Sequence, residues 1–208
     1  MTDIFIPSAA RTAIGTFGGA LAGTPPIDTA AHVARAAIAR AGVEAAQIDQ
    51  VVFGHVLNTE PRDMYLSRVA AIEAGVPQST PAMNVNRLCG SGAQALVSAI
   101  QMLQLGDGTL ALAGGAEAMS RAPYAMQAPR FGQKMGDTKM LDMMLGALTC
   151  PFGTGHMGVT AENVAAEFGI SREEQDAFAL LSQTRAATAI AEGRFADQIA
   201  PFELTGRK

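Results

Sequence analysis

The first part of the chain alternates between strand-like and helix-like stretches, and this alternation constrains the fold more than any other feature. Four short apolar stretches read as strands, at residues 3–7, 51–57, 82–85 and 109–113. Three longer stretches between them carry apolar residues at helical spacing, at residues 27–42, 64–75 and 92–105. Parallel strands need crossover connections, which are usually helices, so this order predicts a largely parallel sheet covered by helices. The sequence therefore predicts an α/β fold.

The character of the sequence changes near Met119. Residues 119–155 hold many Met, Gly and Pro residues and show little alternation. We therefore expect a domain boundary here, with an α/β domain over residues 1–118 and a second domain over residues 119–208. The second domain reads as an inserted loop region, or lid, rather than as a continuation of the sheet.

Two helices are expected in the second domain, at residues 160–168 and 172–192. Ser171 followed by Glu174 fits a capping box, which predicts where the second helix begins. The last residues, 202–208, read as the entry into a further strand or loop. We therefore expect the lid domain to be incomplete.

Composition and charge exclude several classes of function. Hydrophobic residues make up 49% of the chain and charged residues 16%, which suits a well-buried core and argues against disorder. The net charge of −4 gives no basic patch for nucleic acid or for an anionic membrane. Aromatic residues amount to 5% with no Trp, which leaves few platforms for stacking bases. We expect neither a nucleic-acid nor a membrane partner.

The cysteine pattern and the N-terminus indicate a cytoplasmic protein. The two cysteines, Cys89 and Cys150, lie far apart and belong to no Cys/His ligand pattern, so no metal site is expected. Two lone cysteines are typical of a reducing compartment. Residues 1–10 lack the basic and apolar regions of a secretory signal, and no apolar run is long enough to span a bilayer.

The most informative stretch for chemistry is residues 86–92, with the sequence Asn-Arg-Leu-Cys-Gly-Ser-Gly. An expected strand precedes it and an expected helix follows, so Cys89 should lie at or near a helix N-terminus. The dipole and free N–H groups of the helix favour a thiolate there and could hold an oxyanion. The alternative is that Cys89 is a small buried apolar residue, as most free cysteines are. The strand–Cys–Gly–x–Gly–helix setting favours the nucleophile.

The same stretch resembles the nucleophile motif of the thiolases. Three further segments resemble motifs of that family in the same order along the chain, at residues 11–15, 114–120 and 156–165. The fold implied is a thiolase-type layered sheet covered by helices, of which this chain is the N-terminal half with the incomplete lid domain. Residues 59–65 resemble bacterial members that accept more than acetyl chains.

The resemblance implies a two-step acyl transfer between CoA thioesters, by thiolysis of a 3-ketoacyl-CoA or by Claisen condensation of acetyl-CoA. Cys89 matches the nucleophile that carries the acyl group. Leu148, His156 and Met157 match lid residues that line the tunnel for the pantetheine arm. No cofactor is implied, because acyl-CoA and CoA are substrates, and the full-length enzyme is expected to be a homo-oligomer.

The chain departs from the family pattern in what it lacks. In the family, the activating histidine, the second catalytic cysteine and an Asn of the oxyanion hole belong to a C-terminal half that these residues do not contain, and no Gly-rich Cys motif surrounds Cys150. We therefore keep an alternative, a non-catalytic fragment or a subunit that pairs with a separate C-terminal half. A related condensing enzyme such as a ketoacyl synthase is a third possibility, although its flanking motifs differ.

Other polar residues have simpler explanations. His55, on an expected strand, is interpreted as a packed or hydrogen-bonded residue. His156 taken alone would be a structural or capping residue, and only the lid motif favours contact with substrate. Glu60, Arg62 and Asp63 are expected to form a solvated loop with local ion pairs.

Overall fold

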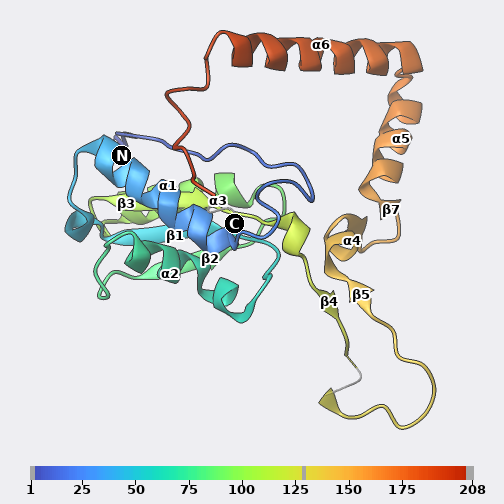
Figure 1. Ribbon diagram of the computed structural model, residues 1–208, viewed down its shortest axis with the longest axis horizontal. Coiled ribbons are helices and arrows are strands. Elements are labelled where there is room, and N and C mark those ends of the chain that lie inside the picture. The colour runs from blue at the N-terminus through green and yellow to red at the C-terminus, as the bar shows by residue number, and fades with distance from the viewer. Residues whose placement is uncertain (1–2, 128–129, 205–208) are drawn as a thin grey trace. The chain divides into compact units, whose positions relative to one another are not determined.

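The structure is a computed structural model that describes residues 3–127 and 130–204 (Figure 1). The chain divides into two compact units, which are described separately. Unit 1 comprises Met1–Pro123 and Ile199–Lys208, and unit 2 comprises Tyr124–Gln198. The sequence-based boundary at residue 118 stays a prediction. The return of the chain to unit 1 is marked by the N–H of Ala200, which donates to the carbonyl of Arg11 over 2.8 Å.

Unit 1 contains a parallel sheet with helices on both faces. Its described strands are β1 Gln50–Gly54, β2 Ala82–Val85 and β3 Ala111–Gly115. Its helices are α1 Pro26–Ala41, α2 Leu66–Glu73 and α3 Ser91–Leu105, with the short 3₁₀ turns η1 Ala45–Gln47, η2 Pro61–Tyr65 and η3 Met119–Arg121. The strands lie in the order β2-β1-β3, and both pairings are parallel. The predicted α/β sheet with helical crossovers is therefore confirmed.

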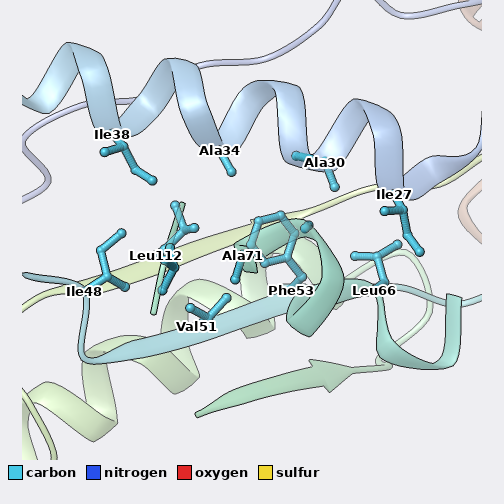
Figure 2. Packing of buried hydrophobic residues seen from close by; sticks show 13 residues of the cluster. Ile27, Ala30, Ala34, Ile38, Ile48, Val51, Phe53, Leu66, Ala71 and Leu112 are labelled. Atoms are coloured by element: carbon cyan, nitrogen blue, oxygen red, sulfur yellow. The ribbon is translucent and has the colours of Figure 1, made fainter. Parts of the chain in front are cut away.

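The central strand β1 is buried on both sides because its side chains alternate between two layers of helices. Val51 and Phe53 belong to a cluster with α1 and α2, whereas Val52 packs with Ala95 and Ala99 of α3. Figure 2 shows the first of these layers, where one face of α1 covers the sheet. The α1 side chains in this layer follow helical spacing and are Ile27, Ala30, Ala31, Ala34 and Ile38.

Helix α1 shows how local sequence sets the ends of an element. It begins at Pro26, which tolerates the first turn because its missing N–H would have no partner there. It ends at Gly42, which adopts a φ of 65° as the expected C-cap, a conformation that glycine takes without steric cost.

The prediction of a strand at residues 3–7 is wrong, because the structure has no strand there. Phe5 and Ile6 are 83% and 64% exposed. A short apolar run becomes a strand only when a neighbouring strand supplies ladder hydrogen bonds, and sequence pattern cannot show whether that neighbour is present. The expected strand at 51–57 is likewise shorter, since β1 ends at Gly54.

Unit 2 consists of short strand pairs and helices. Its elements are β4 Tyr124–Ala125, β5 Leu141–Asp142, α4 Met143–Ala147, β6 Thr149–Cys150, β7 Gly155–His156, α5 Met157–Phe168 and α6 Arg172–Ala191. The pairs β4–β5 and β6–β7 are antiparallel. Both predicted helices are confirmed, although α5 begins earlier than expected. The predicted capping box is present, because Ser171 Oγ accepts from the N–H of Glu174 and the Glu174 carboxylate accepts from the N–H of Ser171.

Candidate active site

Cys89 lies in the turn that connects β2 to α3. Its position is two residues before Ser91, the first residue of the helix, and Gly90 is the N-cap. The thiol is exposed, which distinguishes Cys89 from the buried free cysteines of most proteins. The expected position at a helix N-terminus is confirmed, while the role of Cys89 as nucleophile stays a prediction.

Two side chains hydrogen-bond to the backbone of this turn. Asn86 Oδ1 accepts from the N–H of Leu88 over 3.0 Å. Ser91 Oγ accepts from the N–H of Arg87 over 2.8 Å and donates to the carbonyl of Leu88 over 2.7 Å. The N–H of Gly90 closes the turn on the carbonyl of Arg87 over 3.1 Å. Side chains of the motif at residues 86–92 therefore hold the backbone around Cys89.

A glycine allows the start of α3 to approach the sheet closely. A Cβ added to Gly54, the last residue of β1, would lie 2.5 Å from the carbonyl carbon of Ser91 and 2.7 Å from the nitrogen of Gly92. A Cβ on Gly115, at the end of β3, would lie 3.1 Å from the carbonyl oxygen of Gly54. The turn with Cys89 therefore lies at the carboxyl ends of the parallel strands, where open α/β sheets bind ligands.

A buried histidine and a glutamate join the ends of β1 and β3. His55 is 5% exposed, and its Nδ1 donates to the carbonyl of Ala116 over 2.9 Å. The carboxylate of Glu117 accepts from the N–H groups of Val56 and Leu57 over 2.9 and 3.1 Å. The N–H of His55 still donates to the carbonyl of Val85 in β2 over 3.0 Å, and the amides of Val56 and Leu57 then turn to Glu117 instead of a strand. The interpretation of His55 as a hydrogen-bonded residue is confirmed.

The loop at residues 59–65 is more ordered than the sequence suggests. Asp63 is fully buried, and its Oδ2 accepts from the backbone N–H of Thr59 and of Glu60 and from the Thr59 hydroxyl. Arg121 donates to Glu60 Oε2 over 2.9 Å and to the carbonyl of Gly23 over 3.0 Å. The expectation that Asp63 belongs to a solvated loop is therefore wrong. Its side chain caps the 3₁₀ turn η2, a role that charge and spacing did not reveal.

The three predicted lid residues lie together in one hairpin of unit 2. Leu148 follows α4, and its carbonyl accepts from the N–H of Met157 over 2.9 Å. His156 lies on β7, which pairs with β6. Its Nδ1 accepts from the N–H of Gly158 over 3.0 Å, so it caps α5. This bond leaves Nε2 as the position for the proton of a neutral imidazole. The three lid residues thus belong to unit 2, whereas Cys89 belongs to unit 1.

Cys150, the second free thiol, lies on β6 and is half-buried. A hydrogen bond from the Thr154 hydroxyl, together with the backbone N–H groups of Phe152 and Thr154, lowers the pKa of Cys150 below its ordinary value. A thiolate is the reactive form of cysteine. Reactivity toward small alkylating reagents is therefore not expected to single out Cys89.

A hollow in unit 1 is lined mostly by apolar residues and has a volume of about 810 Å³. It is lined by residues 4–17 together with parts of α1, α3 and β3, and the lining includes Gly92 but not Cys89.

Within residues 3–127 and 130–204, no three His, Cys, Asp or Glu side chains gather in a way that could hold a metal ion. In that same part of the chain, no helix has the length and apolar character needed to cross a membrane.

Comparison with known proteins identifies the family. The family described as "Thiolase, N-terminal domain" matches residues 4–208. The beta-ketothiolase BktB of Cupriavidus necator is 56% identical over 206 residues, which is 99% of this chain and 52% of the relative. The crystal structure of the Bacillus anthracis acetyl-CoA acetyltransferase has a TM-score of 0.93 and 40% identity, covering 98% of this chain and 51% of that one. Human mitochondrial 3-ketoacyl-CoA thiolase in complex with CoA gives the same TM-score and identity, covering 96% and 51%.

The chain belongs to the thiolase family, and its fold is that of the N-terminal thiolase half. The chain spans about half the length of the curated relatives it matches.

Three polar residues of the nucleophile motif and of the motif at 114–120 have roles that their sequence pattern did not predict. Asn86 and Ser91 hold the backbone around Cys89, and Glu117 holds the loop after β1. Asn86 directly follows β2 and Glu117 comes two residues after β3. This position was the available signal for these two residues, because the carboxyl ends of parallel strands meet at one edge of the sheet.

Proposed function

We propose that this chain supplies the nucleophile of a thiolase-type acyltransferase that acts on CoA thioesters, and that Cys89 carries the acyl group. The observation that carries this proposal is the exposed Cys89 thiol on a tight turn at the start of α3, in a chain that belongs to the thiolase family. The N–H groups of a helix start favour a thiolate and an oxyanion beside it.

The proposed thiolysis has two steps. In the first, the Cys89 thiolate attacks the 3-keto carbon of a 3-ketoacyl-CoA, the bond between C2 and C3 breaks, and the leaving acetyl-CoA carbanion takes a proton. In the second, the thiol of free CoA attacks the acyl-enzyme thioester, transfers the acyl group to its own sulfur and returns Cys89. The reverse sequence is Claisen condensation of acetyl-CoA. The covalent intermediate predicts ping-pong kinetics.

The lid hairpin is proposed to bind the arm of the substrate. Leu148, His156 and Met157 lie together in unit 2, and Met157 is 42% exposed. Methionine and leucine suit a flexible apolar arm, and an exposed imidazole offers one hydrogen bond. The CoA complex of the human relative supports CoA as the ligand class. Because acyl-CoA and CoA are themselves substrates, we propose that the reaction needs no further cofactor.

We also propose a cytoplasmic, homo-oligomeric enzyme of fatty acid metabolism. Two lone cysteines, typical of a reducing compartment, support the cytoplasmic setting. The net charge of −4 argues against nucleic acid and anionic membranes as partners.

A second candidate is a chain that does not turn over substrate alone and works with a separate C-terminal half. One observation favours it, namely that the chain spans about half the length of its relatives. Groups that act as a catalytic unit fail together when one is missing. On this proposal the purified chain shows no thiolysis of acetoacetyl-CoA, and a separately expressed C-terminal half of the Cupriavidus necator relative restores it. Turnover by the chain alone, with its mass verified, contradicts this candidate.

The test of the first proposal is the site of acylation. The chain is incubated with acetyl-CoA, with and without the complementing half, and acetyl adducts are mapped by peptide mass spectrometry. We expect the adduct on Cys89, its loss in Cys89→Ser, and its retention in Cys150→Ser. Cys150 is the competing thiol, because its pKa is lowered. An adduct on Cys150 in place of Cys89, or none on Cys89 in the complemented enzyme, overturns the assignment.

A further inference from the structure

The residue directly before Cys89 has an unusual backbone conformation. Leu88 has a φ of 48°, in the left-handed region that side chains other than glycine, asparagine and aspartate rarely adopt. Among the residues that the structure describes, it is the only non-glycine residue with positive φ. Such strain persists only where the surroundings hold it, and it concentrates at functional sites.

Both peptide groups of Leu88 are held by side chains of the same motif. Asn86 Oδ1 accepts its N–H over 3.0 Å, and the Ser91 hydroxyl donates to its carbonyl over 2.7 Å. The Ser91 hydroxyl also accepts from the N–H of Arg87 over 2.8 Å. The backbone N–H of Ser91 donates to the same Leu88 carbonyl over 2.9 Å, so side chains and backbone together fix the two peptide planes around Leu88.

Ser91 is itself anchored to the sheet. It is 5% exposed, and its carbonyl carbon would lie 2.5 Å from a Cβ on Gly54 of β1. Ser91 therefore packs against the sheet, and the hydrogen bonds of its hydroxyl fix the turn relative to β1. Asn86, by contrast, is exposed, so its bond to Leu88 adds to the turn without being part of the core.

We propose that Ser91 and Asn86 are positioning residues that hold Leu88 in the left-handed region and thereby fix the direction in which Cys89 presents its thiol. If Leu88 relaxes to negative φ, the peptide between Leu88 and Cys89 rotates and carries Cys89 with it. This inference rests on the proposed role of Cys89 and adds to it the residues that specify its geometry.

Paired variants test the proposal. Ser91→Ala removes the hydroxyl bridge, and Asn86→Ala removes the acceptor for the N–H of Leu88, with Asn86→Asp as the conservative variant that keeps an acceptor oxygen. Leu88→Gly in the Ser91→Ala background is the rescue, because glycine adopts positive φ without strain. Leu88→Ala in the same background is its matched control, because alanine shortens the side chain but still avoids positive φ.

Two rates on Cys89 are measured in the complemented enzyme, acetyl transfer from acetyl-CoA and alkylation by iodoacetamide. Acyl transfer needs an aligned thiol, and small misplacements cost up to about 100-fold. We expect Ser91→Ala to slow acetyl transfer ~10- to 100-fold and alkylation by less than ~3-fold. Leu88→Gly restores acetyl transfer and Leu88→Ala does not. Asn86→Ala shows the same pattern, and Asn86→Asp retains most of the wild-type rate.

Several outcomes overturn the inference. Acetyl transfer that is unchanged in both Ser91→Ala and Asn86→Ala removes their positioning role. Equal rescue by Leu88→Gly and Leu88→Ala shows that the size of the side chain matters and not its conformation. If Ser91→Ala fails to fold by circular dichroism, the exposed Asn86 variants decide the question.

Failure of the proposed function has a different signature. In that case wild-type Cys89 receives no acetyl group, whatever the variants do. The positioning claim is then decided by the backbone in a crystal structure of Ser91→Ala. A Leu88 φ that stays positive without the Ser91 hydroxyl overturns it, and a φ that becomes negative supports it.

Discussion

Unit 1 and unit 2 are stabilised in different ways. In unit 1 the side chains of β1 are buried between two layers of helices. In unit 2 Ala189 is the only buried residue among those that the structure describes. The large apolar side chains of its two long helices are instead exposed, by 71% for Phe168 and by 70% for each of Phe178, Leu180 and Ile190.

The comparison distinguishes burial of apolar side chains from local capping hydrogen bonds. The helices of unit 1 owe their positions to burial, which dominates folding free energy. The helix ends of unit 2 are defined by local bonds, such as the capping box of Ser171 and the cap of His156 on α5. Short isolated helices are marginal in water, so caps define where α5 and α6 begin without supplying the stability that a core gives.

The largest expected effect compares a core phenylalanine with an exposed one. Phe53→Ala should lower the free energy of unfolding by about 3–5 kcal/mol, because it removes a fully buried ring from the centre of unit 1. Phe178→Ala on α6 should change it by less than about 0.5 kcal/mol. Urea unfolding followed by circular dichroism measures both. Equal losses would mean that α6 contributes to a core as much as β1 does.

A pair of glycines sharpens the comparison within unit 1. Gly54→Ala should cost about 1–3 kcal/mol, because its Cβ would collide with the backbone of Ser91 and Gly92. Gly92→Ala is the matched control, since nothing lies within 4 Å of its added Cβ. It should be neutral or stabilising by up to about 1 kcal/mol through helix propensity. Thermal unfolding measures both variants, and a Gly54→Ala variant as stable as wild type would contradict the close approach of α3.

His156→Ala tests whether unit 2 contributes to binding. In the complemented enzyme we expect kcat/KM to fall ~10- to 100-fold, about one or two hydrogen bonds of transition-state binding. The acetyl adduct on Cys89 should remain detectable, whereas Cys89→Ser should abolish it. Steady-state kinetics are measured beside a melting curve. An unchanged kcat/KM with a lowered Tm would show that His156 only caps α5.

The smallest effect is a dependence of stability on pH. Hydrogen bonds from the backbone N–H of Thr109, then the N–H of Leu110, then the Thr109 hydroxyl lower the pKa of Asp49 from 3.8. A lowered folded pKa stabilises the fold above the unfolded pKa, and this contribution disappears as the pH falls through the folded value. Asp49→Asn should therefore be less stable than wild type at neutral pH and should match it well below pH 3.8.

Glu174 is the counterpart of Asp49 in unit 2. Its pKa is lowered by the backbone N–H and then the hydroxyl of Ser171, three residues away. Asp49 instead joins segments 60 residues apart. Glu174→Gln should affect only the helix content of α6, whereas Asp49→Asn should shift the urea midpoint of unit 1. A shift of that midpoint by Glu174→Gln would contradict a purely local role for the Glu174 cap.

Local sequence predicted the elements and one part of the site. The strand–helix alternation, the Gly42 cap, the Ser171 capping box and the placement of Cys89 before a helix all agree with the structure. Each depends on residues within a few positions of one another, and the spacing of such residues in the sequence predicts the interaction.

The tertiary structure decided which distant segments meet. Sequence gave no basis for placing β1 between β2 and β3, for the burial of Asp63, or for the reach of Glu117 to the amides of Val56 and Leu57. It also predicted a strand at residues 3–7 that the fold does not form. The physical reason is the range of the interaction. A cap, including the bonds of Asp63 to Thr59 and Glu60, is satisfied within its own turn. A strand ladder, the bonds of Glu117 and the burial of Asp63 instead require segments remote in sequence to pack together.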